Sequence, residues 1–530
     1  MKASVLVLGA FASATTALEL TKRENPAVLN IPFERQLRQN DQTSTSRRTR
    51  RDAVSVDTGL NGNTWAYWAN FTLGTPPTKL WAEFDTGSAD LLILTSEVEL
   101  CQKDESNCFG GVATANESST WEWTSKEVQG SFGSGESWTG EYAQDVLKIG
   151  GAELKNFQFA AAEHYSEGNW GLFNIFGIGL WTQEHDQKGY NNLPYALAEA
   201  GYIKSPAYSV WLESREHGNF LFGAVDKSKY KGPLVTLPIS VNNRPTWPTT
   251  KANTKGRDRF IVPLSGFGVT VDGKSDTKKD YEPRPILLDT GNADSYISEE
   301  MAVWLIQRIE GIEITDEASP YRAIVGPCDG DWKDVTIDFS FAELTINVPL
   351  SSMFAPWKGL TGVKDGKRRC AINLYSTTSH DEMSLGEDFL RNAYVVYDLA
   401  NFEVSMAAIN KDGGKEDIHE IGTRSVPGAV QATEVPQRYE DYVIESLTAA
   451  DPTNPPPEVA VTFVSNYAEL ASASETQDAD KASKTGGTDK STETGDSEDG
   501  DDEDGSAAGV AAPVILSTLL AMSVMSVICF

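Results

Sequence analysis

The chain has 530 residues, with 76 acidic and 45 basic side chains, and its formal net charge is −31. This length exceeds what one hydrophobic core usually serves, so we expect two or more core units together with tails. A charge this negative argues against a nucleic-acid partner, because the phosphate backbone would repel the protein.

The N-terminus has the pattern of a secreted precursor. Lys2 precedes an apolar run that ends in small residues, so residues 1–17 are predicted to be a signal peptide, with a buried helix as the alternative. Residues 18–51 are predicted to be a pro-peptide, because this basic segment ends in "SRRTRRDA" with a dibasic cleavage site after Arg51. An exposed linker is the alternative for that segment.

Residues from about 65 to 409 are rich in β-strand patterns. Short aromatic and β-branched runs such as "WAYWANFTL" and "AYVVYDLANFEVSMAAI" alternate with Gly, Asn and Pro turns. Helix patterns are few. The strongest begins at Ser298, a capping residue followed by Glu299 and Glu300, and a weaker one covers residues 192–203. The sequence therefore predicts an all-β body with a few short helices.

Sequons and cysteines fit an oxidising, secretory compartment. Asn70 and Asn116 each begin an Asn-x-Ser/Thr sequon, which predicts N-glycosylation at exposed positions. Five cysteines are present, and the last of them belongs to the C-terminal tail, which leaves four that allow three disulfide connectivities. The five are Cys101, Cys108, Cys328, Cys370 and Cys529.

The C-terminal part has a different composition. Residues 411–505 are predicted to be a linker and an acidic disordered spacer, because they are polar, rich in Gly and Pro, and end in a strongly acidic run. Residues 506–530 lead from small residues into an apolar tail with no Lys or Arg behind it. This indicates a GPI-attachment signal that is removed, with attachment near Ser506, and a tail-anchored membrane helix is the alternative.

The β-rich body repeats one motif. "WAEFDTGSADLLIL" carries Asp85 and "PILLDTGNADSYI" carries Asp289, each followed by Thr and Gly after an apolar run. Each copy is followed by a second apolar segment with a glycine, Gly177 in "NIFGIGL" and Gly386 in "MSLGEDFL". A repeat this long predicts two homologous lobes, at about 65–225 and 226–410, within a domain of residues 52–410.

One Asp-Thr-Gly is ordinary turn chemistry, but two flanked copies a domain's length apart predict a pair of carboxylates at one centre. Two like charges at hydrogen-bonding distance cannot both ionise easily, so they share one proton. The ionised partner can take a proton from water, and the protonated partner can donate to a carbonyl oxygen. Thr86 and Thr290 are well placed to hydrogen-bond across the lobe junction. The pattern predicts acid/base hydrolysis with water as the nucleophile.

The chain resembles the pepsin-like aspartic proteases between Trp65 and Ile409. The resemblance implies an all-β, bilobal fold with a cleft between the lobes, and Asp85 and Asp289 as the catalytic pair. The sequence itself has no pattern that indicates a metal site or a cofactor. Together with the spacing, the resemblance implies the pairs Cys101–Cys108 and Cys328–Cys370. The motifs are "LGTPP", "FDTGS", "FGSG", "NIFGIG", "LLDTGN" and "LGEDFLRNAYVVYD". The residues it implies as loop support are Thr86, Gly87, Ser88, Thr290, Gly291, Asn292, Gly177 and Gly386, and as the substrate-covering flap Phe132, Gly133, Ser134 and Gly135.

The signal peptide, dibasic pro-segment, acidic spacer and GPI-like tail make the chain similar to the fungal, surface-anchored yapsin-type branch. This resemblance implies an acid-active endopeptidase that is a monomer, is held on the outer face of the membrane or in the cell wall, and acts on proteins or peptides. A preference for basic residues rests on this resemblance and on the acidic surface. The rival hypothesis is a surface-anchored binding or wall protein without catalysis.

Three positions depart from the family pattern. Phe132 stands where the flap usually carries Tyr, and Leu92 stands where a Trp usually hydrogen-bonds that Tyr. Both partners of one bond are missing together, which costs less than losing one, and predicts an apolar flap. Asn292 stands where Ser or Thr usually follows the second Asp-Thr-Gly, and its amide is expected to donate to Asp289. No His-Glu-x-x-His pair or Gly-x-Ser-x-Gly elbow is present.

Overall fold

The structure is a computed structural model of the chain. It describes residues 28–35, 67–103, 107–132, 136–166, 172–186, 189–214, 217–240, 257, 259–315, 321–355, 362–364, 367–377 and 383–435. All of them belong to one compact unit. Several predicted features lie outside these residues: the signal peptide, the cleavage site after Arg51, the acidic spacer, the anchor signal near Ser506, and Gly133, Ser134 and Gly135 of the flap.

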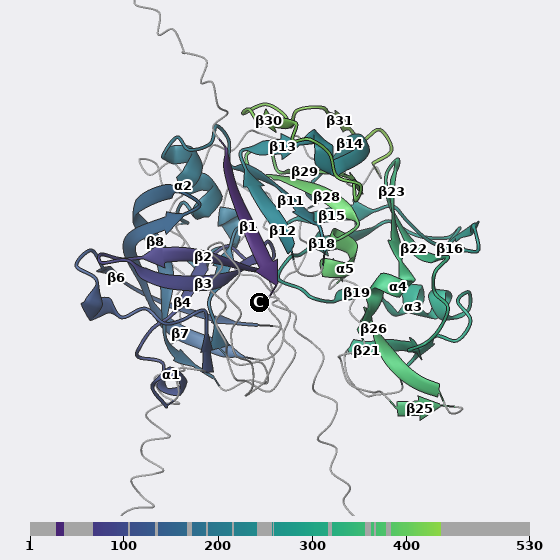
Figure 1. The fold of residues 1–530 in the computed structure, drawn as a ribbon, viewed down its shortest axis with the longest axis horizontal. Coiled ribbons are helices and arrows are strands. Elements are labelled where there is room, and N and C mark those ends of the chain that lie inside the picture. The colour runs from purple at the N-terminus through teal and green to yellow at the C-terminus, as the bar shows by residue number, and fades with distance from the viewer. Residues whose placement is uncertain are drawn as a thin grey trace, which may run out of the picture. The chain divides into compact units, whose positions relative to one another are not determined.

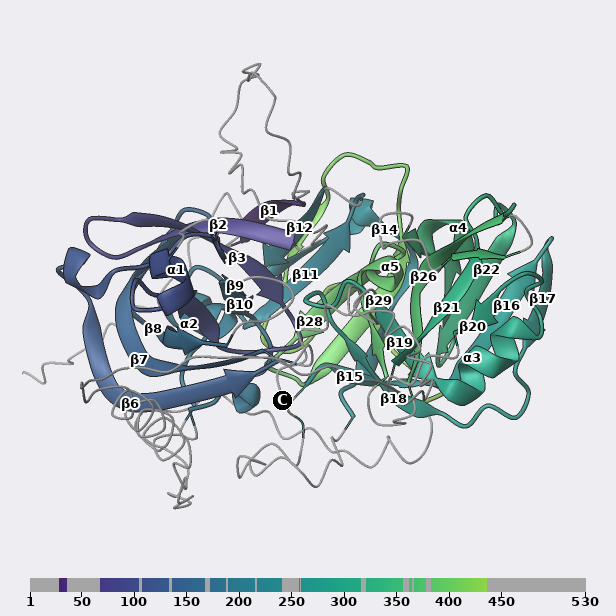
Figure 2. The same cartoon turned by 90° about the horizontal axis from the view of Figure 1, so that it is seen from below.

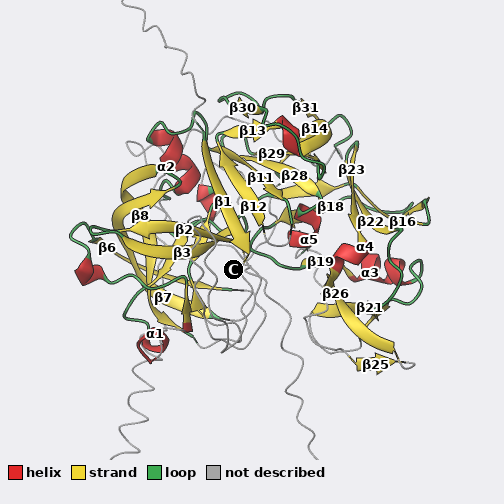
Figure 3. Ribbon diagram, viewed as in Figure 1, coloured by secondary structure: helices red, strands yellow, loops and turns green. Residues whose placement is uncertain are grey.

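Strands dominate the described residues, as predicted, and the helices are few and short (Figures 1 and 3). The strands of the first half are β1 (Leu29–Arg35), β2 (Tyr67–Leu73), β3 (Thr78–Asp85), β4 (Leu91–Leu94), β5 (Cys108–Phe109), β6 (Glu122–Ser131), β7 (Ser137–Ile149), β8 (Ala152–Tyr165), β9 (Leu172–Phe173), β10 (Ile175–Gly177), β11 (Ala207–Leu212), β12 (His217–Phe222), β13 (Ala224–Asp226) and β14 (Tyr230–Pro238).

The strands of the second half are β15 (Ile261–Leu264), β16 (Gly266–Val271), β17 (Lys274–Thr277), β18 (Arg284–Leu288), β19 (Ser295–Ser298), β20 (Glu313–Ile314), β21 (Tyr321–Pro327), β22 (Val335–Phe341), β23 (Leu344–Pro349), β24 (Phe354–Ala355), β25 (Gly362–Lys364), β26 (Lys367–Thr377), β27 (Ser384–Leu385), β28 (Ala393–Asp398), β29 (Glu403–Ile409), β30 (Ile418–Glu420) and β31 (Ala429–Gln431).

The helices are α1 (Glu99–Lys103), α2 (Leu193–Glu199), α3 (Glu299–Ile306), α4 (Leu350–Met353) and α5 (Glu387–Leu390). The two predicted helices are therefore confirmed as α2 and α3. Ser298 caps α3, because its hydroxyl accepts a hydrogen bond from the backbone N–H of Met301 at 3.3 Å.

Among the described residues, a fourteen-stranded sheet connects the two halves. Its order is β31-β14-β29-β28-β11-β12-β1-β2-β3-β10-β4-β8-β7-β6, so strands of the second half pair with strands of the first at β28 and β11. In Figure 2, β11 and β28 lie between the strands β2 to β8 on one side and β16 to β26 on the other. A further sheet of the second half has the order β15-β18-β27-β19-β26-β21-β20. The two-lobed, all-β architecture is confirmed.

Each lobe places its Asp-Thr-Gly by the same strand arrangement. In the first lobe, β3 ends at Asp85 and runs parallel to β10, and β10 pairs antiparallel with β4. In the second lobe, β18 ends one residue before Asp289 and runs parallel to β27, and β27 pairs antiparallel with β19. The glycine-containing segments after each motif therefore supply the strand that holds the motif in place.

Aromatic side chains pack behind the first motif. Phe84, one residue before Asp85, is fully buried, and its ring centroid lies 5.1 Å from that of Phe176 and 4.9 Å from that of Phe220. Edge-to-face packing of this kind adds to the stability gained from burying the rings. The core therefore fixes the strand that carries the first carboxylate.

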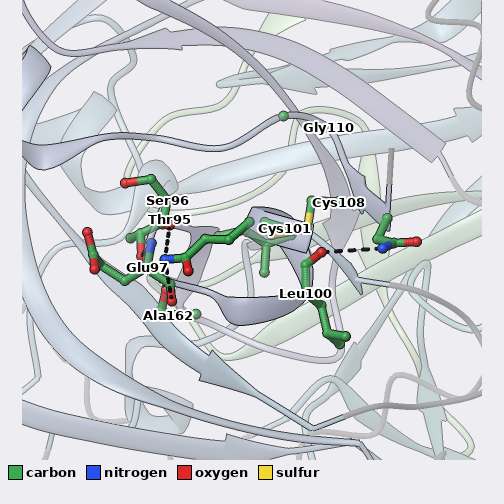
Figure 4. Close-up of a disulfide and its surroundings, with 12 residues drawn as sticks. Thr95, Ser96, Glu97, Leu100, Cys101, Cys108, Gly110 and Ala162 are labelled. Atoms are coloured by element: carbon green, nitrogen blue, oxygen red, sulfur yellow. Dashed lines mark hydrogen bonds between the residues drawn. A yellow bond between two sulfur atoms is a disulfide. The ribbon is translucent and has the colours of Figure 1, made fainter. Parts of the chain in front are cut away.

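Both disulfides have the predicted pairing. Cys101 and Cys108 are joined in the first lobe, and Cys328 and Cys370 in the second. In Figure 4, the first bridge lies beside the 95–97 turn, where the Thr95 hydroxyl donates to the carbonyl oxygen of Ala162 at 2.7 Å. The bridge closes a short loop beside this hydrogen-bonded turn. Cys529 lies outside the described residues.

The strand β1 lies inside the predicted pro-peptide, and no strand was predicted there. It pairs antiparallel with β12 along residues 29–34 and with β2 at its end. Residues 29–35 of the predicted pro-segment therefore form one strand of the fourteen-stranded sheet, between β12 and β2.

The chain also stays folded beyond residue 410, which corrects the predicted start of the linker. β30 pairs with β13, and β31 extends the large sheet by pairing parallel with β14. Ile421 and Val426 are buried at 0% and 3% exposure. These two buried apolar residues stand among Gly, Pro and charged residues, so the sequence shows no periodic pattern that would predict a folded segment here.

No helix in the described part of the chain is long and apolar enough to cross a membrane. The predicted anchor signal at 506–530 is outside that part. The two predicted sequon asparagines, Asn70 on β2 and Asn116, are exposed.

Candidate active site

The two repeated aspartates, far apart along the chain, meet at the junction of the lobes. Both are completely buried. A Cβ atom placed on Gly87 would lie 2.6 Å from Oδ2 of Asp289, and one placed on Gly291 would lie 2.7 Å from Cγ of Asp85. Only glycine allows each backbone to come this close to the opposite carboxyl group. The spatial pairing expected from the sequence is therefore present.

Two threonines tie the motifs together with reciprocal hydrogen bonds. The hydroxyl of Thr86 donates to the carbonyl oxygen of Leu288 at 3.0 Å and accepts from the backbone N–H of Thr290 at 2.9 Å. The hydroxyl of Thr290 donates to the carbonyl oxygen of Phe84 at 2.8 Å and accepts from the backbone N–H of Thr86 at 3.1 Å. This is the cross-lobe bonding that the sequence predicted, and it sets the separation of the two carboxyl groups.

Gly177 and Gly386 lie directly behind the two motifs. A Cβ on Gly177 would lie 2.6 Å from backbone atoms of Ala89 and Asp90, and one on Gly386 would overlap the carbonyl oxygens of Asn292 and Asp294. The N–H of Gly177 donates to the carbonyl oxygen of Asp90 at 2.9 Å. Both glycines therefore leave room for the backbone of the catalytic loops to pack closely against them.

Within its own lobe, Asp85 has more hydrogen-bond donors than Asp289. The backbone N–H of Gly87 donates to Oδ1 of Asp85 at 2.7 Å, and the hydroxyl of Ser88 donates to Oδ2. Asp289 receives the N–H of Gly291 at 2.9 Å. Its Oδ2 has no hydrogen-bond partner among the described residues.

The expectation that the Asn292 amide donates to Asp289 is wrong. Its Nδ2 donates to the hydroxyl of Ser384 at 3.0 Å, and its Oδ1 accepts from the backbone N–H of Asp294 at 3.1 Å. Ser384 belongs to β27, which runs beside the second motif. Its hydroxyl therefore lies within reach of the Asn292 amide, which hydrogen-bonds it instead of the carboxyl group of Asp289. Asn292 thus stabilises the loop through these two hydrogen bonds, neither of which involves Asp289.

The two carboxyl groups differ in their proton affinity. Burial raises the pKa of Asp85, while the hydrogen bonds from Ser88, Asp289 and Gly87 oppose that rise. Burial raises the pKa of Asp289 further above its ordinary value, and the negative charge of Asp85 adds to this effect. These surroundings favour the ionised form at Asp85 more than at Asp289, and two neighbouring buried carboxyl groups cannot both ionise easily.

The base of the predicted flap is apolar, as the sequence indicated. Phe132 is buried and belongs to one hydrophobic cluster with Leu92, Trp138 and Tyr142. Its backbone N–H donates to the carbonyl oxygen of Glu136 at 2.8 Å, which closes the hairpin formed by β6 and β7. Phe132 and Leu92 thus belong to one apolar cluster, which replaces the Tyr–Trp hydrogen bond of the family pattern.

Sequence reasoning missed the polar residues that hold the first motif. The amide of Gln183 donates to the carbonyl oxygen of Gly87, and the amide of Asn192 donates to that of Ala89 at 3.2 Å. Both side chains are buried at 8% and 1% exposure. They lie in "GLWTQEHDQKGYNN", a polar stretch after Gly177 that has the composition of an exposed loop. The one signal in the sequence that could have identified these residues is that the stretch directly follows Gly177, the glycine paired with the first Asp-Thr-Gly motif.

Comparisons with known proteins agree with this geometry. A family model described as Eukaryotic aspartyl protease matches residues 66–409. The chain is 31% identical over 446 residues to the probable aspartic-type endopeptidase OPSB of Trichophyton verrucosum, covering 80% of this chain and 86% of that protein.

Two further relatives have comparable similarity. A probable aspartic-type endopeptidase opsB of Aspergillus oryzae is 32% identical over 432 residues, covering 79% of this chain and 84% of its own length. Aspartic proteinase yapsin-3 of Saccharomyces cerevisiae is 30% identical over 393 residues, covering 71% of this chain and 72% of its own length.

Proposed function

Because the chain belongs to the eukaryotic aspartyl protease family, we propose that Asp85 and Asp289 are the catalytic pair with which it hydrolyses peptide bonds. The protein is an aspartic-type endopeptidase of the fungal yapsin-type branch. The observation that carries the assignment is the placement of two buried carboxyl groups against each other's glycine, at the junction of two homologous lobes.

Because their surroundings differ, the two acids have different roles in this proposal. Asp85, supported by Gly87 and Ser88, is the ionised group, so it accepts a proton from a water molecule between the carboxyls. Asp289 holds the shared proton and donates it to the scissile carbonyl oxygen as water adds to the carbon. Collapse of the tetrahedral intermediate returns the oxygen's proton to Asp289, while the proton held by Asp85 passes to the leaving amine. The pair ends in its starting state.

The flap formed by β6 and β7 covers the substrate in this proposal. Its base includes Phe132, which belongs to the same apolar cluster as Leu92. Protein or peptide substrates follow from the enzyme class. A preference for basic residues is supported by the net charge of −31 and by the likeness to yapsin-3.

We further propose a zymogen that is secreted and anchored at the cell surface. Cleavage after Arg51 releases residues 18–51, which include the strand β1 of the large sheet. The signal peptide at 1–17 and the GPI-attachment signal at 506–530 place the mature domain outside the membrane, on the acidic spacer. Release of the protein from intact cells by phosphatidylinositol-specific phospholipase tests the anchor. Retention after that treatment contradicts it.

The catalytic proposal is tested with the secreted chain after removal of the pro-segment. A peptide library is incubated with the protein between about pH 3 and pH 7, the range in which a carboxyl dyad works. Cleavage that disappears in Asp85→Asn supports the proposal. Absence of cleavage by the processed wild type favours the rival, a binding or wall protein on the same scaffold, which the replaced flap pair Phe132 and Leu92 motivates.

A further inference from the structure

A second aspartate of the first catalytic loop, Asp90, lies five residues after Asp85 and is 6% exposed. Its Oδ1 accepts hydrogen bonds from the hydroxyl groups of Tyr142 at 2.7 Å and Tyr190 at 2.8 Å. Its Oδ2 accepts from the backbone N–H of His185 at 2.9 Å and lies 2.7 Å from Nδ1 of the same residue. These contacts surround the buried carboxylate with partners from two other segments of the chain, which satisfies its charge and ties those segments to the catalytic loop.

His185 belongs to the segment that supports the first catalytic loop, the turn that contains Asp85. That segment, residues 177–192, donates hydrogen bonds to the carbonyl oxygens of Asp85, Gly87, Ser88, Ala89 and Asp90. The His185 side chain is 18% exposed and continues this contact from backbone to side chain. The loop with Asp85 and the segment with His185 therefore form one hydrogen-bonded body.

The same two residues also contact the flap strand β7. Tyr142 lies on β7 and donates to Asp90, and its hydroxyl accepts from the N–H of Asp186 at 2.9 Å. Trp138, four residues earlier on β7 and close to the flap tip, meets the His185 ring edge to face at 5.7 Å between centroids. The pair of Asp90 and His185 thus joins three elements: the catalytic loop, its supporting segment and the flap strand.

We propose that Asp90 and His185 are a positioning pair that fixes the flap strand relative to the catalytic loop, an inference that rests on the proposed function. Neither residue touches the substrate in this proposal. The pair takes the place of the flap hydrogen bond whose two partners are absent at Phe132 and Leu92. Its loss leaves Asp85 and Asp289 in place but lets the flap settle less accurately over a bound peptide.

The charges around the pair determine its response to pH. The ionisable groups around the pair are Glu184 and Asp186 on the same segment as His185, Lys126 on β6, and the phenols of Tyr142 and Tyr190. Lys126 forms a salt bridge with Asp186 at 2.6 Å. Burial raises the pKa of Asp90, but the hydrogen bonds and charge of His185 outweigh it, so the pKa lies below its usual value. The pair's contribution is therefore present above the unfolded pKa of Asp90 and is lost as the pH falls through the lowered one.

The test compares His185→Ala and His185→Asn with the wild type in the full secreted, processed chain. His164→Ala is the matched control, because His164 is an exposed histidine on β8 opposite Thr139 of β7 without a contact to Asp90. Active sites are first counted by titration with a peptide whose scissile bond is replaced by a hydroxyl-bearing isostere. Rates are then expressed per titrated site, which removes any difference in the folded fraction.

For His185→Ala we expect KM to rise about tenfold, with a smaller fall in kcat, because flap contacts bind the peptide. KM should also begin to rise at a higher pH than in the wild type as the pH is lowered, because Asp90 protonates more easily without the imidazole. His185→Asn supplies a neutral donor in place of Nδ1, so it should restore KM at higher pH and leave the onset of the rise in KM displaced. His164→Ala should match the wild type.

Two results overturn the positioning pair: a His185→Ala enzyme whose KM per titrated site matches the wild type at every pH, or equal changes in His164→Ala. If His185→Ala yields no folded protein, His185→Asn decides alone, and a KM whose rise begins at the wild-type pH contradicts the proposal. An inactive wild type contradicts the proposed function itself. An active wild type with unchanged His185 variants contradicts the positioning pair alone.

Discussion

The two Asp-Thr-Gly loops use one backbone design with different polar neighbours. In both, a strand delivers the aspartate, a threonine bonds across to the opposite lobe and a glycine faces the opposite carboxyl. The residue after the glycine differs. Ser88 donates to Asp85, whereas Asn292 turns to Ser384 and leaves Asp289 with the N–H of Gly291 from its own lobe. The shared backbone brings the acids together, and the differing residue after the glycine adds to the chemical difference between them.

The largest effect should come from removing either carboxylate. Asp85→Asn and Asp289→Asn should each lower kcat/KM by roughly a thousandfold or more, because each removes one half of the acid/base pair. Single-turnover cleavage of a reporter peptide by purified variants measures this loss. A variant that keeps more than about a tenth of the wild-type rate would contradict the shared role of the two loops.

The two disulfides, one in each lobe, close chain loops of different length. Reduction or Cys→Ala replacement of Cys328–Cys370 should cost about 4 kcal/mol and that of Cys101–Cys108 about 2.5 kcal/mol, by loop-closure entropy. The sequence separations are 42 and 7 residues. Denaturant unfolding of the double-alanine variants gives both values. Equal losses would show that native contacts outweigh the loop length.

The threonine pair tests whether the cross-lobe bonds are symmetric. Thr86→Val and Thr290→Val each remove a hydroxyl that donates one hydrogen bond and accepts another. Each should lower the free energy of unfolding by about 1–3 kcal/mol, because buried partners are left unsatisfied. Losses that differ by more than about twofold would show that one lobe depends more on the junction than the other.

The smallest effect should come from exchanging the residues that distinguish the loops. Asn292→Ser places a hydroxyl where it can donate to Asp289, which favours the ionised form and lowers its pKa. The basic limb of kcat/KM should then move to lower pH. Ser88→Ala should raise the pKa of Asp85 and move the acid limb up. The pH profiles of both variants give the result, and shifts of opposite sign to these would contradict the assignment of roles.

Much of this organisation could be predicted from the sequence because it depends on repeated local patterns. The two motifs, their supporting glycines, the disulfides, the helix capped by Ser298 and the all-β class all followed from spacing, composition and family resemblance. Each is encoded within a short stretch of chain.

What the sequence did not predict depends on contacts between distant segments. The amide of Asn292 could be oriented only with Ser384, 92 residues away, in view. The Asp90 and His185 contact spans 95 residues. The strand β1 pairs with β12 across the whole first lobe, and residues 411–435 are folded through two isolated apolar anchors, Ile421 and Val426. None of these leaves a periodic or local signal.

The central claim is that Asp85 and Asp289 share a single proton. Carbon-13 NMR of the aspartate carboxyl groups, followed through a pH titration and assigned with Asp85→Asn and Asp289→Asn, measures it directly. We predict that one carboxyl ionises first, at Asp85, and that the other keeps its proton to a much higher pH, with each titration altered when the partner is replaced. Two carboxyl groups that ionise independently near their ordinary pKa would contradict the account.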